Sequence, residues 1–211
     1  MLKNQPLSPH FGAELNAGIE LLRCSDETIE ALKLLVAKEG VLVARNQSMT
    51  PAEQTAFAAR LGELFPSPKP SETVPEGLIQ IKADERSKGA AGTAWHTDVS
   101  SEARPPSISM LRMEVVPPVG GDTLFMDMRQ VFSNLSAKMQ DLLKQLSARH
   151  DPVGHYLYLS GQKALHELPS GHHPIVRQIP ETGDVALYVN EGFTRGIDGL
   201  AESESKFLLR F

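Results

Sequence analysis

The chain has 211 residues, 41% of them hydrophobic, which is enough for one full hydrophobic core and rather short for two. Its net charge of −5 and isoelectric point near 5.8 argue against a surface for nucleic acid or anionic membranes, because the 21 lysines and arginines are scattered rather than clustered. A lone cysteine, Cys24, excludes an internal disulfide and a cysteine-rich metal site, and the first residues lack a signal-peptide-like apolar core. We therefore expect a soluble cytoplasmic protein whose residues 1–211 belong to a single domain.

Two helices are predicted early in the chain, after an irregular strand region at residues 11–22. Ser25 is a typical N-cap and Gly40 a typical stop, so the first helix should lie between them. The stretch Thr50-Pro51-Ala52-Glu53 starts the second helix with a cap, a proline at the first helical position and a glutamate placed to close a capping box. A short buried strand at residues 41–44 separates the two helices. The predicted core-facing residues of these helices are Ile29, Leu32, Leu35, Val36, Phe57, Leu61 and Leu64.

The middle of the chain is predicted to be mostly loop. Four prolines between residues 65 and 77 remove helical periodicity, and residues 78–82 predict a strand. Residues 83–94 are small and polar, and long loops inside a compact domain are often functional. Residues 107–116, rich in Ile, Met and Val, predict another strand.

The last third of the chain predicts helices around a β-hairpin. Asp127 and Gln130 cap a brief helical turn, and residues 136–147 form a helix with Met139, Leu142, Leu143 and Leu146 inside. Residues 175–179 and 185–190 flank the turn signal Glu181-Thr182-Gly183-Asp184. The final helix, residues 201–211, ends on its most apolar turn, so the chain reads as cut short.

The stretch Trp95-His96-Thr97-Asp98 carries the first candidate chemistry. If it is extended, the side chains of His96 and Asp98 leave the same face. An imidazole and a carboxylate side by side supply two of the three ligands of a facial non-haem Fe(II) site. The spacing alone favours the alternative interpretation, a strand histidine hydrogen-bonded to a neighbouring carboxylate.

The order of several motifs resembles the taurine dioxygenase (TauD/TfdA) family of Fe(II)- and 2-oxoglutarate-dependent oxygenases, over roughly residues 10–211. In chain order the matching stretches are Thr50-Pro51-Ala52-Glu53-Gln54, Leu61-Gly62-Glu63-Leu64, Trp95-His96-Thr97-Asp98, Gly120-Gly121-Asp122-Thr123, His150-Asp151, His173-Pro174-Ile175-Val176-Arg177 and Leu187-Tyr188-Val189-Asn190-Glu191-Gly192-Phe193-Thr194. Each stretch is moderately specific, and the set favours the iron interpretation of His96 and Asp98.

The resemblance implies an α+β, mainly β fold: a double-stranded β-helix (jelly-roll) core with flanking α-helices. His96 and Asp98 would ligate Fe(II) at the mouth of the barrel. The implied reaction uses O2, decarboxylates 2-oxoglutarate to succinate and CO2, and hydroxylates a small organic substrate. The carboxylate of Asp98 favours hydroxylation, because related halogenating enzymes have a small residue at this position.

The resemblance also assigns the surroundings of the metal. Thr123 would hydrogen-bond the distal carboxylate of 2-oxoglutarate; the alternative is a hydroxyl that only closes the Gly-Gly turn. Val99, Tyr156 and Phe193 fall where family members line the substrate pocket, although each could equally pack in the core.

The chain departs from the family pattern in two respects. The second histidine ligand and the arginine for the 2-oxoglutarate carboxylate would lie beyond Phe211, and no ligand motif contains His155, His166, His172 or His173. We therefore expect a C-terminally truncated chain with two of three protein ligands and without the last strands of the barrel. Where taurine-specific members carry His, Tyr and Asn, this chain has Ser67, Pro70 and Gly92, which cannot make charge-assisted bonds to a sulfonate, so taurine itself is disfavoured.

Two other classes of function remain open. A non-catalytic β-helix protein for binding or regulation is favoured by the missing ligand and disfavoured by the intact His96, Asp98 and Thr123 set. A cupin with hydrolase or isomerase chemistry is disfavoured because the histidines are not closely spaced. The expected partner is a small-molecule substrate, with no nucleic acid or membrane, and a homo-oligomer stays open.

Overall fold

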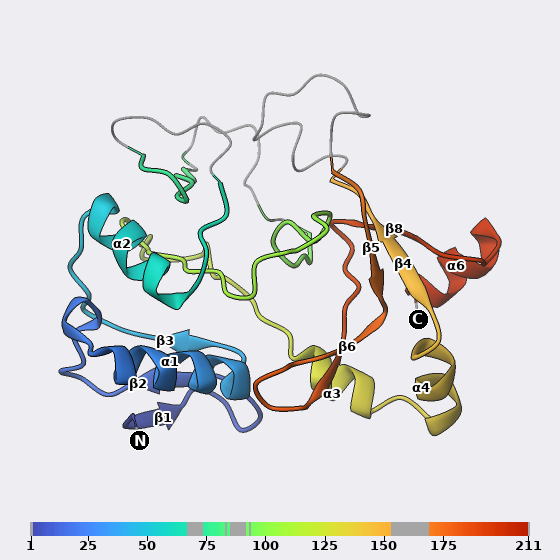
Figure 1. Ribbon diagram of the computed structural model, residues 1–211, viewed down its shortest axis with the longest axis horizontal. Coiled ribbons are helices and arrows are strands. Elements are labelled where there is room, and N and C mark those ends of the chain that lie inside the picture. Colours follow the sequence, from blue (N-terminus) through green and yellow to red (C-terminus); the bar gives the residue numbers. More distant parts are fainter. Residues whose placement is uncertain are drawn as a thin grey trace.

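The computed structural model describes residues 2–66, 74–82, 84, 92, 94–152 and 169–210 (Figure 1). In chain order the elements are β1 (Asn4–Pro6), β2 (Ala13–Leu15), the 3-10 turn η1 (Leu21–Arg23), α1 (Asp26–Glu39), β3 (Leu42–Val43), α2 (Pro51–Leu61), α3 (Met128–Ser133), α4 (Ala137–Leu143), β4 (Ser147–His150), β5 (Gly171–Pro174), β6 (Val176–Gln178), β7 (Val185–Leu187), β8 (Thr194–Ile197) and α6 (Glu202–Arg210). Helices and three small sheets alternate in an α+β arrangement.

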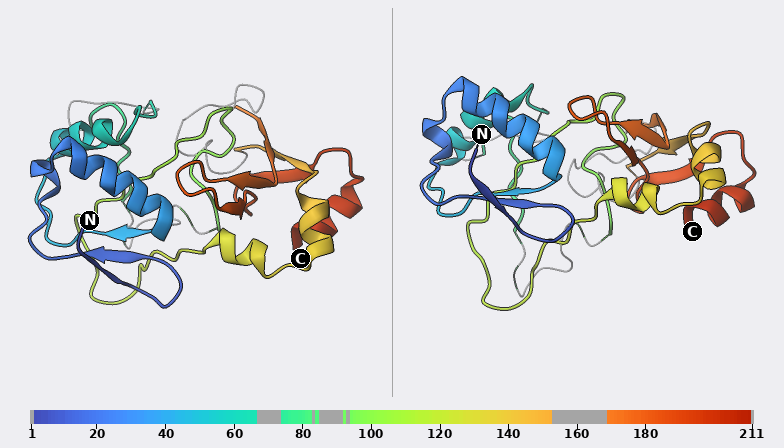
Figure 2. Two further views of the ribbon diagram at one scale, coloured as in Figure 1. Left: turned by 60° about the horizontal axis from the view of Figure 1, so that its bottom comes forward. Right: turned by 90° about the horizontal axis from the view of Figure 1, so that it is seen from below.

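The N-terminal elements form one layer of sheet and one of helix. Strand β2 pairs antiparallel with β1 and parallel with β3, and α1 lies beside this sheet (Figures 1 and 2). The apolar side chains of α1 and α2 meet those of β2 and η1. The buried residues of this N-terminal core are Leu15, Leu21, Ile29, Leu32, Met49 and Phe57.

The C-terminal elements form a second layered unit at the other end of the molecule (Figure 2). Strand β4 lies between β5 and β8, antiparallel to both, and β6 pairs with β7 as a hairpin. Helix α6 is fixed to β8 by Ser205, whose buried Oγ accepts a hydrogen bond of 2.8 Å from the Ile197 N–H. The buried residues of this C-terminal core are Leu143, Ala148, Ile175 and Ile197.

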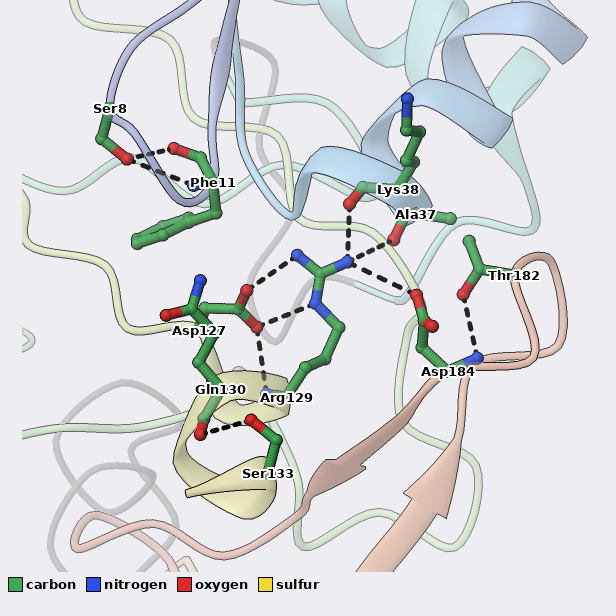
Figure 3. A network of polar contacts seen from close by, with 10 residues as sticks. All are labelled: Ser8, Phe11, Ala37, Lys38, Asp127, Arg129, Gln130, Ser133, Thr182 and Asp184. Carbon is green, nitrogen blue, oxygen red and sulfur yellow. Dashed lines mark hydrogen bonds and ion pairs between the residues drawn. The ribbon is translucent and has the colours of Figure 1, made fainter.

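Arg129 joins the two units (Figure 3). Its Nε and Nη2 donate to the Asp127 carboxylate at 2.8 and 2.9 Å, and its Nη1 donates to the Lys38 carbonyl at 2.6 Å. The same Nη1 lies 3.8 Å from the Asp184 carboxylate, in the turn between β6 and β7. One guanidinium therefore connects the last turn of α1, the N-cap of α3 and the C-terminal hairpin.

The structure confirms the predictions that rest on local signals. Ser25 caps α1 and Gly40 ends it, and Thr50 and Glu53 form a reciprocal capping box on α2. The hairpin around residues 181–184 is present, as are the helical turn after Asp127 and the last helix.

Three element predictions are wrong. Residues 78–82 and 107–116 form no strand, and no strand within the described ranges pairs with either stretch as a ladder requires. The helix predicted for residues 136–147 ends at Leu143, and Ser147–His150 becomes β4 instead. Pairing with β5 and β8 on both sides outweighs the weak strand preference of that sequence. Leu142, expected inside, is 45% exposed.

Within the described ranges, no helix combines the length and apolar character needed to cross a bilayer.

Candidate functional site

His96 and Asp98 lie side by side in the structure. The His96 Nε2 is 3.3 Å from Asp98 Oδ1, and both side chains are partly open to solvent. The Asp98 carboxylate raises the pKa of His96, an effect that the partial burial of the ring opposes. The two side chains therefore lie close together, an arrangement that fits both the ligand interpretation and the alternative of a histidine hydrogen-bonded to a neighbouring carboxylate.

Neighbouring groups fix how each of the two side chains presents its atoms. The Nδ1 of His96 is 2.8 Å from the Ala94 carbonyl, and because a carbonyl only accepts, Nδ1 carries a proton. The Ser109 hydroxyl donates to Asp98 Oδ2 at 2.6 Å. In the neutral ring, Nε2 thus directs its lone pair at the remaining carboxylate oxygen, Oδ1.

A shared proton or a metal ion would stabilise these two atoms at their observed separation. Two lone pairs that face each other at 3.3 Å repel, unless a proton or a metal ion lies between them. Ligands about 2.0–2.2 Å from a metal and at right angles to each other are roughly 3 Å apart, close to the observed separation. A neutral imidazole nitrogen and a carboxylate oxygen are also the donor types of a non-haem iron site.

The residues after Asp98 form a tight turn with a strained backbone. Val99 has a φ of +44°, which is rare for a β-branched residue. The Glu102 N–H donates to the Val99 carbonyl at 3.0 Å, and Ser100 and Ser101 are fully buried. The turn therefore leaves His96 and Asp98 near the surface and directs the next residues into the protein.

Residues of β4, β5 and the β7–β8 connection contact this stretch from the protein interior. We use "seat" for Gly171, Gly192, His150, His173 and Asn190. Ser100 Oγ is 3.0 Å from His150 Nδ1 and accepts a hydrogen bond of 3.1 Å from Asn190 Nδ2. The seat also bonds the backbone of residues 95–102: Gly192 N–H donates to the Trp95 carbonyl at 2.9 Å, and His173 Nε2 donates to the Glu102 carbonyl at 3.0 Å.

Rings pack together inside the seat. His150 stacks on Tyr188 with centroids 5.5 Å apart, and His173 meets both rings edge-on at 5.3 Å. Burial, followed by the positive field of His173, lowers the pKa of His150 to about 4. Burial also lowers the pKa of His173. Both rings are therefore neutral near pH 7.

The structure describes three of the other four predicted site residues, namely Thr123, Val99 and Phe193. Thr123 is exposed, and its hydroxyl makes no hydrogen bond to any residue that the structure describes, so nothing there supports the turn-closing alternative. Phe193 is 2% exposed, and Val99 is half-buried in its turn. Tyr156 lies outside the described residues.

The remaining histidines do not join His96 and Asp98. His172 Nδ1 is 2.9 Å from the exposed Asp198 carboxylate, and His173 contacts Glu102 as above. Among the described residues there is no group of three His, Cys, Asp or Glu side chains arranged to hold a metal. His155, His166, Ser67 and Pro70 lie outside those residues, whereas Gly92 approaches the His96 ring.

Comparison with known proteins identifies the family. The taurine catabolism dioxygenase TauD, TfdA family matches residues 3–211. The chain belongs to the TauD/TfdA family. An alpha-ketoglutarate-dependent sulfonate dioxygenase from Saccharomyces cerevisiae is 35% identical over 228 residues, which cover all of this chain and 54% of the relative. A (S)-phenoxypropionate/alpha-ketoglutarate-dioxygenase from Sphingobium herbicidovorans is 30% identical and is covered over 76% of its length.

The fold agrees with solved TauD/TfdA structures. A taurine dioxygenase from Burkholderia xenovorans superposes with a TM-score of 0.80 at 30% identity, covering 99% of this chain and 71% of that one. The chain spans little more than half the length of the yeast relative.

Several residues of the site carried no assigned role in the sequence. Ser109 and the Ala94 carbonyl, which orient Asp98 and His96, have no motif that would reveal them. Asn190 and His150 stand in stretches that match the family, which was the available signal, since the residues around them are partly charged. Only the folded chain shows that both bond Ser100.

Proposed function

We propose that this chain is part of an Fe(II)- and 2-oxoglutarate-dependent dioxygenase that hydroxylates a small organic substrate. The observation that carries the proposal is the convergence of His96 Nε2 and Asp98 Oδ1 at 3.3 Å in the family's His-x-Asp stretch. The jelly-roll core and the single-domain organisation of residues 1–211 belong to the same proposal.

His96 and Asp98 are the residues that would hold the iron. Ala94 keeps the proton of His96 on Nδ1, so that Nε2 is the nitrogen that would ligate, and Ser109 holds Oδ2 of Asp98 while Oδ1 faces the histidine. When bound, Fe(II) with 2-oxoglutarate and O2 supplies the oxidative chemistry that decarboxylates the keto acid to succinate and CO2 and hydroxylates the substrate. The partial exposure of both side chains leaves an approach for the ion and the co-substrate.

Thr123 would bind the distal carboxylate of 2-oxoglutarate. Two glycines with a φ of +76°, Gly120 and Gly121, form the turn before it and leave its hydroxyl exposed. A hydroxyl donor suits a carboxylate acceptor, and a hydrogen bond to a charged group contributes about 1.5–3 kcal/mol. Val99, Tyr156 and Phe193 complete the proposal as pocket residues.

The names of the relatives narrow the substrates worth testing. They name sulfonates, sulfate esters and phenoxypropionate, which are all small organic anions. Taurine stays disfavoured for this chain because Gly92 offers no side-chain donor where taurine-specific members carry one. A panel of alkylsulfonates, sulfate esters and aryloxy acids is therefore the first screen for substrate-dependent succinate formation.

The test of the site uses protein expressed from its full reading frame. Anaerobic Fe(II) with 2-oxoglutarate should give the weak visible absorption band of a chelated keto acid. His96→Ala and Asp98→Ala should each abolish the band, because each removes a ligand. Thr123→Ala should weaken 2-oxoglutarate binding by about 1.5–3 kcal/mol and leave iron affinity unchanged.

His172→Ala is the matched control, because His172 and Asp198 form an exposed histidine–carboxylate pair outside the proposed site. It should retain the full band. A full band in the His96 or Asp98 variant would place the metal elsewhere, and unchanged keto-acid binding in Thr123→Ala would remove Thr123 from the site.

A further inference from the structure

The stretch that carries the proposed ligands has a buried anchor of its own. Residues 95–102 begin at the surface with Trp95 and His96 and pass inward through Ser100 and Ser101, which have no exposed surface. Ser100 Oγ bonds both His150, at the end of β4, and Asn190, which follows β7. One hydroxyl thus ties the ligand segment to two points of the C-terminal part that lie 50 and 90 residues away in sequence.

Two glycines allow this segment to approach the seat closely. A Cβ on Gly192 would lie 3.0 Å from the Cβ of His96 and 3.3 Å from the Trp95 carbonyl oxygen. A Cβ on Gly171 would lie 2.8 Å from the Ser101 carbonyl oxygen and 3.0 Å from that of Glu102. Any side chain at either position would push the segment away, so both ends of it are held by backbone contact.

The buried polar groups of this anchor contribute little net free energy to folding. His150 is fully buried, and its Nε2 finds no hydrogen-bond partner within the part of the chain that the structure describes. A buried polar atom left unpaired costs about 1–3 kcal/mol. A buried, directional hydrogen-bond network does, however, fix a single arrangement of the groups that it joins. Here these groups are the C-terminal sheet and the turn after Asp98.

We propose that Ser100, His150 and Asn190 are positioning residues: their buried hydrogen bonds hold residues 95–102 on the seat so that His96 and Asp98 lie in ligating geometry before a metal binds. The strained Val99 fits this role, because an unfavourable φ persists only where surrounding contacts impose it. The inference rests on the proposed function, since it assigns these residues through the metal that His96 and Asp98 would hold.

Metal affinity of the protein, without keto acid or substrate, tests the inference. Ser100→Ala should weaken Co(II) or anaerobic Fe(II) binding by roughly 10- to 100-fold, the range for groups that orient metal ligands. Ser205→Ala is the matched control, because Ser205 is a buried serine whose Oγ also accepts a hydrogen bond, but it fixes α6 rather than the ligand segment. Ser205→Ala should lower the thermal midpoint of the metal-free protein about as much as Ser100→Ala does. Its metal affinity, however, should stay that of the wild type.

A second pair of variants tests the same inference without removing a hydrogen bond. Gly192→Ala should displace His96 and weaken metal binding, whereas Gly196→Ala should not, because a Cβ there meets only the Ser205 hydroxyl at 3.7 Å. Wild-type affinity in both Ser100→Ala and Gly192→Ala would overturn the positioning role while leaving the proposed function intact. Failure of the wild-type protein to bind the metal would overturn the proposed function, and the positioning role with it.

Discussion

At the scale of single residues, the site depends on which atoms its neighbours leave available. Asp98 has two equivalent carboxylate oxygens. Oδ2 accepts the hydrogen bond from Ser109, and Oδ1 faces His96. In the same way, the Ala94 carbonyl accepts a hydrogen bond from Nδ1 of His96, so that Nε2 is the nitrogen that faces Asp98. Under the proposed function, this division would give His96 and Asp98 a defined orientation toward a metal ion.

His150 makes the stability of the protein depend on pH. Its pKa is about 4 in the folded protein, against about 6.5 when unfolded, because the ring is buried near His173, Arg195 and Arg177. The unfolded chain therefore binds the extra proton first. The stabilising contribution is fully present above pH 6.5 and is lost as the pH falls toward 4, by up to about 3 kcal/mol. His173 acts in the same direction.

Urea denaturation from pH 4.5 to 7.5 measures this effect. His150→Asn should lower the free energy of unfolding at pH 7 and flatten its rise with pH, since the variant cannot take up the proton. His10→Asn, which removes an exposed histidine, should keep the wild-type slope. Parallel slopes for His150→Asn and wild type would show that His150 is not the neutral buried group described here.

At the scale of secondary-structure elements, the capping box of α2 is the sharpest local determinant. Thr50 Oγ1 accepts from the Glu53 N–H at 3.2 Å, and the Glu53 carboxylate accepts from the Thr50 N–H at 2.7 Å. Thr50→Ala should lower the free energy of unfolding by about 0.5–2 kcal/mol, measured by chemical denaturation. Thr55→Ala in the same helix should be neutral or stabilising, because its buried hydroxyl has no partner among the described residues. Equal losses in both variants would mean that helix propensity, not the cap, is being measured.

These caps were predictable because all their atoms lie within four residues of each other. Strand β4 was not, because Ser147-Ala148-Arg149-His150 lacks a strand-forming pattern and pairs with residues more than 20 positions away. The strand prediction for residues 107–116 failed for the opposite reason: the pattern is present, but no strand in the described part of the chain pairs with it. The proximity of His96 and Asp98 could be predicted from their spacing, and their proposed role rests on the order of the motifs. Ser109, Ser100, His150 and Asn190, in contrast, make contacts across 11 to 90 residues, which the sequence does not reveal.

At the scale of the whole molecule, two hydrophobic cores must be held in one arrangement. The N-terminal core is built mainly from β2, η1, α1 and α2, and the C-terminal core mainly from α4, β4 and β8. Figure 1 shows these two sets of elements at opposite ends of the molecule. Arg129 forms a polar junction between them (Figure 3). Its side chain is 18% exposed, and that of its partner Asp127 is 9% exposed. Burial alone raises the pKa of Asp127, but the Arg129 guanidinium more than offsets it and leaves that pKa below its usual value.

Arg129→Met should therefore be among the most destabilising single changes in the chain. It leaves the buried Asp127 carboxylate without its counter-charge and the Lys38 carbonyl without its donor, at a cost of about 3–5 kcal/mol. Hydrogen exchange should accelerate in the last turn of α1 and in α3, where the junction is lost, more than in the interior of α2. The exposed ion pair of Arg45 with Glu14 provides the control, and Arg45→Met should cost less than about 1 kcal/mol.

The double variant Asp127→Asn/Arg129→Met separates the two contributions of the junction. If the loss in Arg129→Met comes mainly from an uncompensated buried charge, removing that charge should recover part of the stability. If it comes from the bonds to α1, the double variant should be no more stable than Arg129→Met, because the Lys38 and Ala37 carbonyls stay unpaired in both. We expect partial recovery, since the Asp127 carboxylate is the more deeply buried charge and the carbonyls at the end of a helix can turn to water. Wild-type stability in Arg129→Met alone would show that the two cores are held together by other contacts.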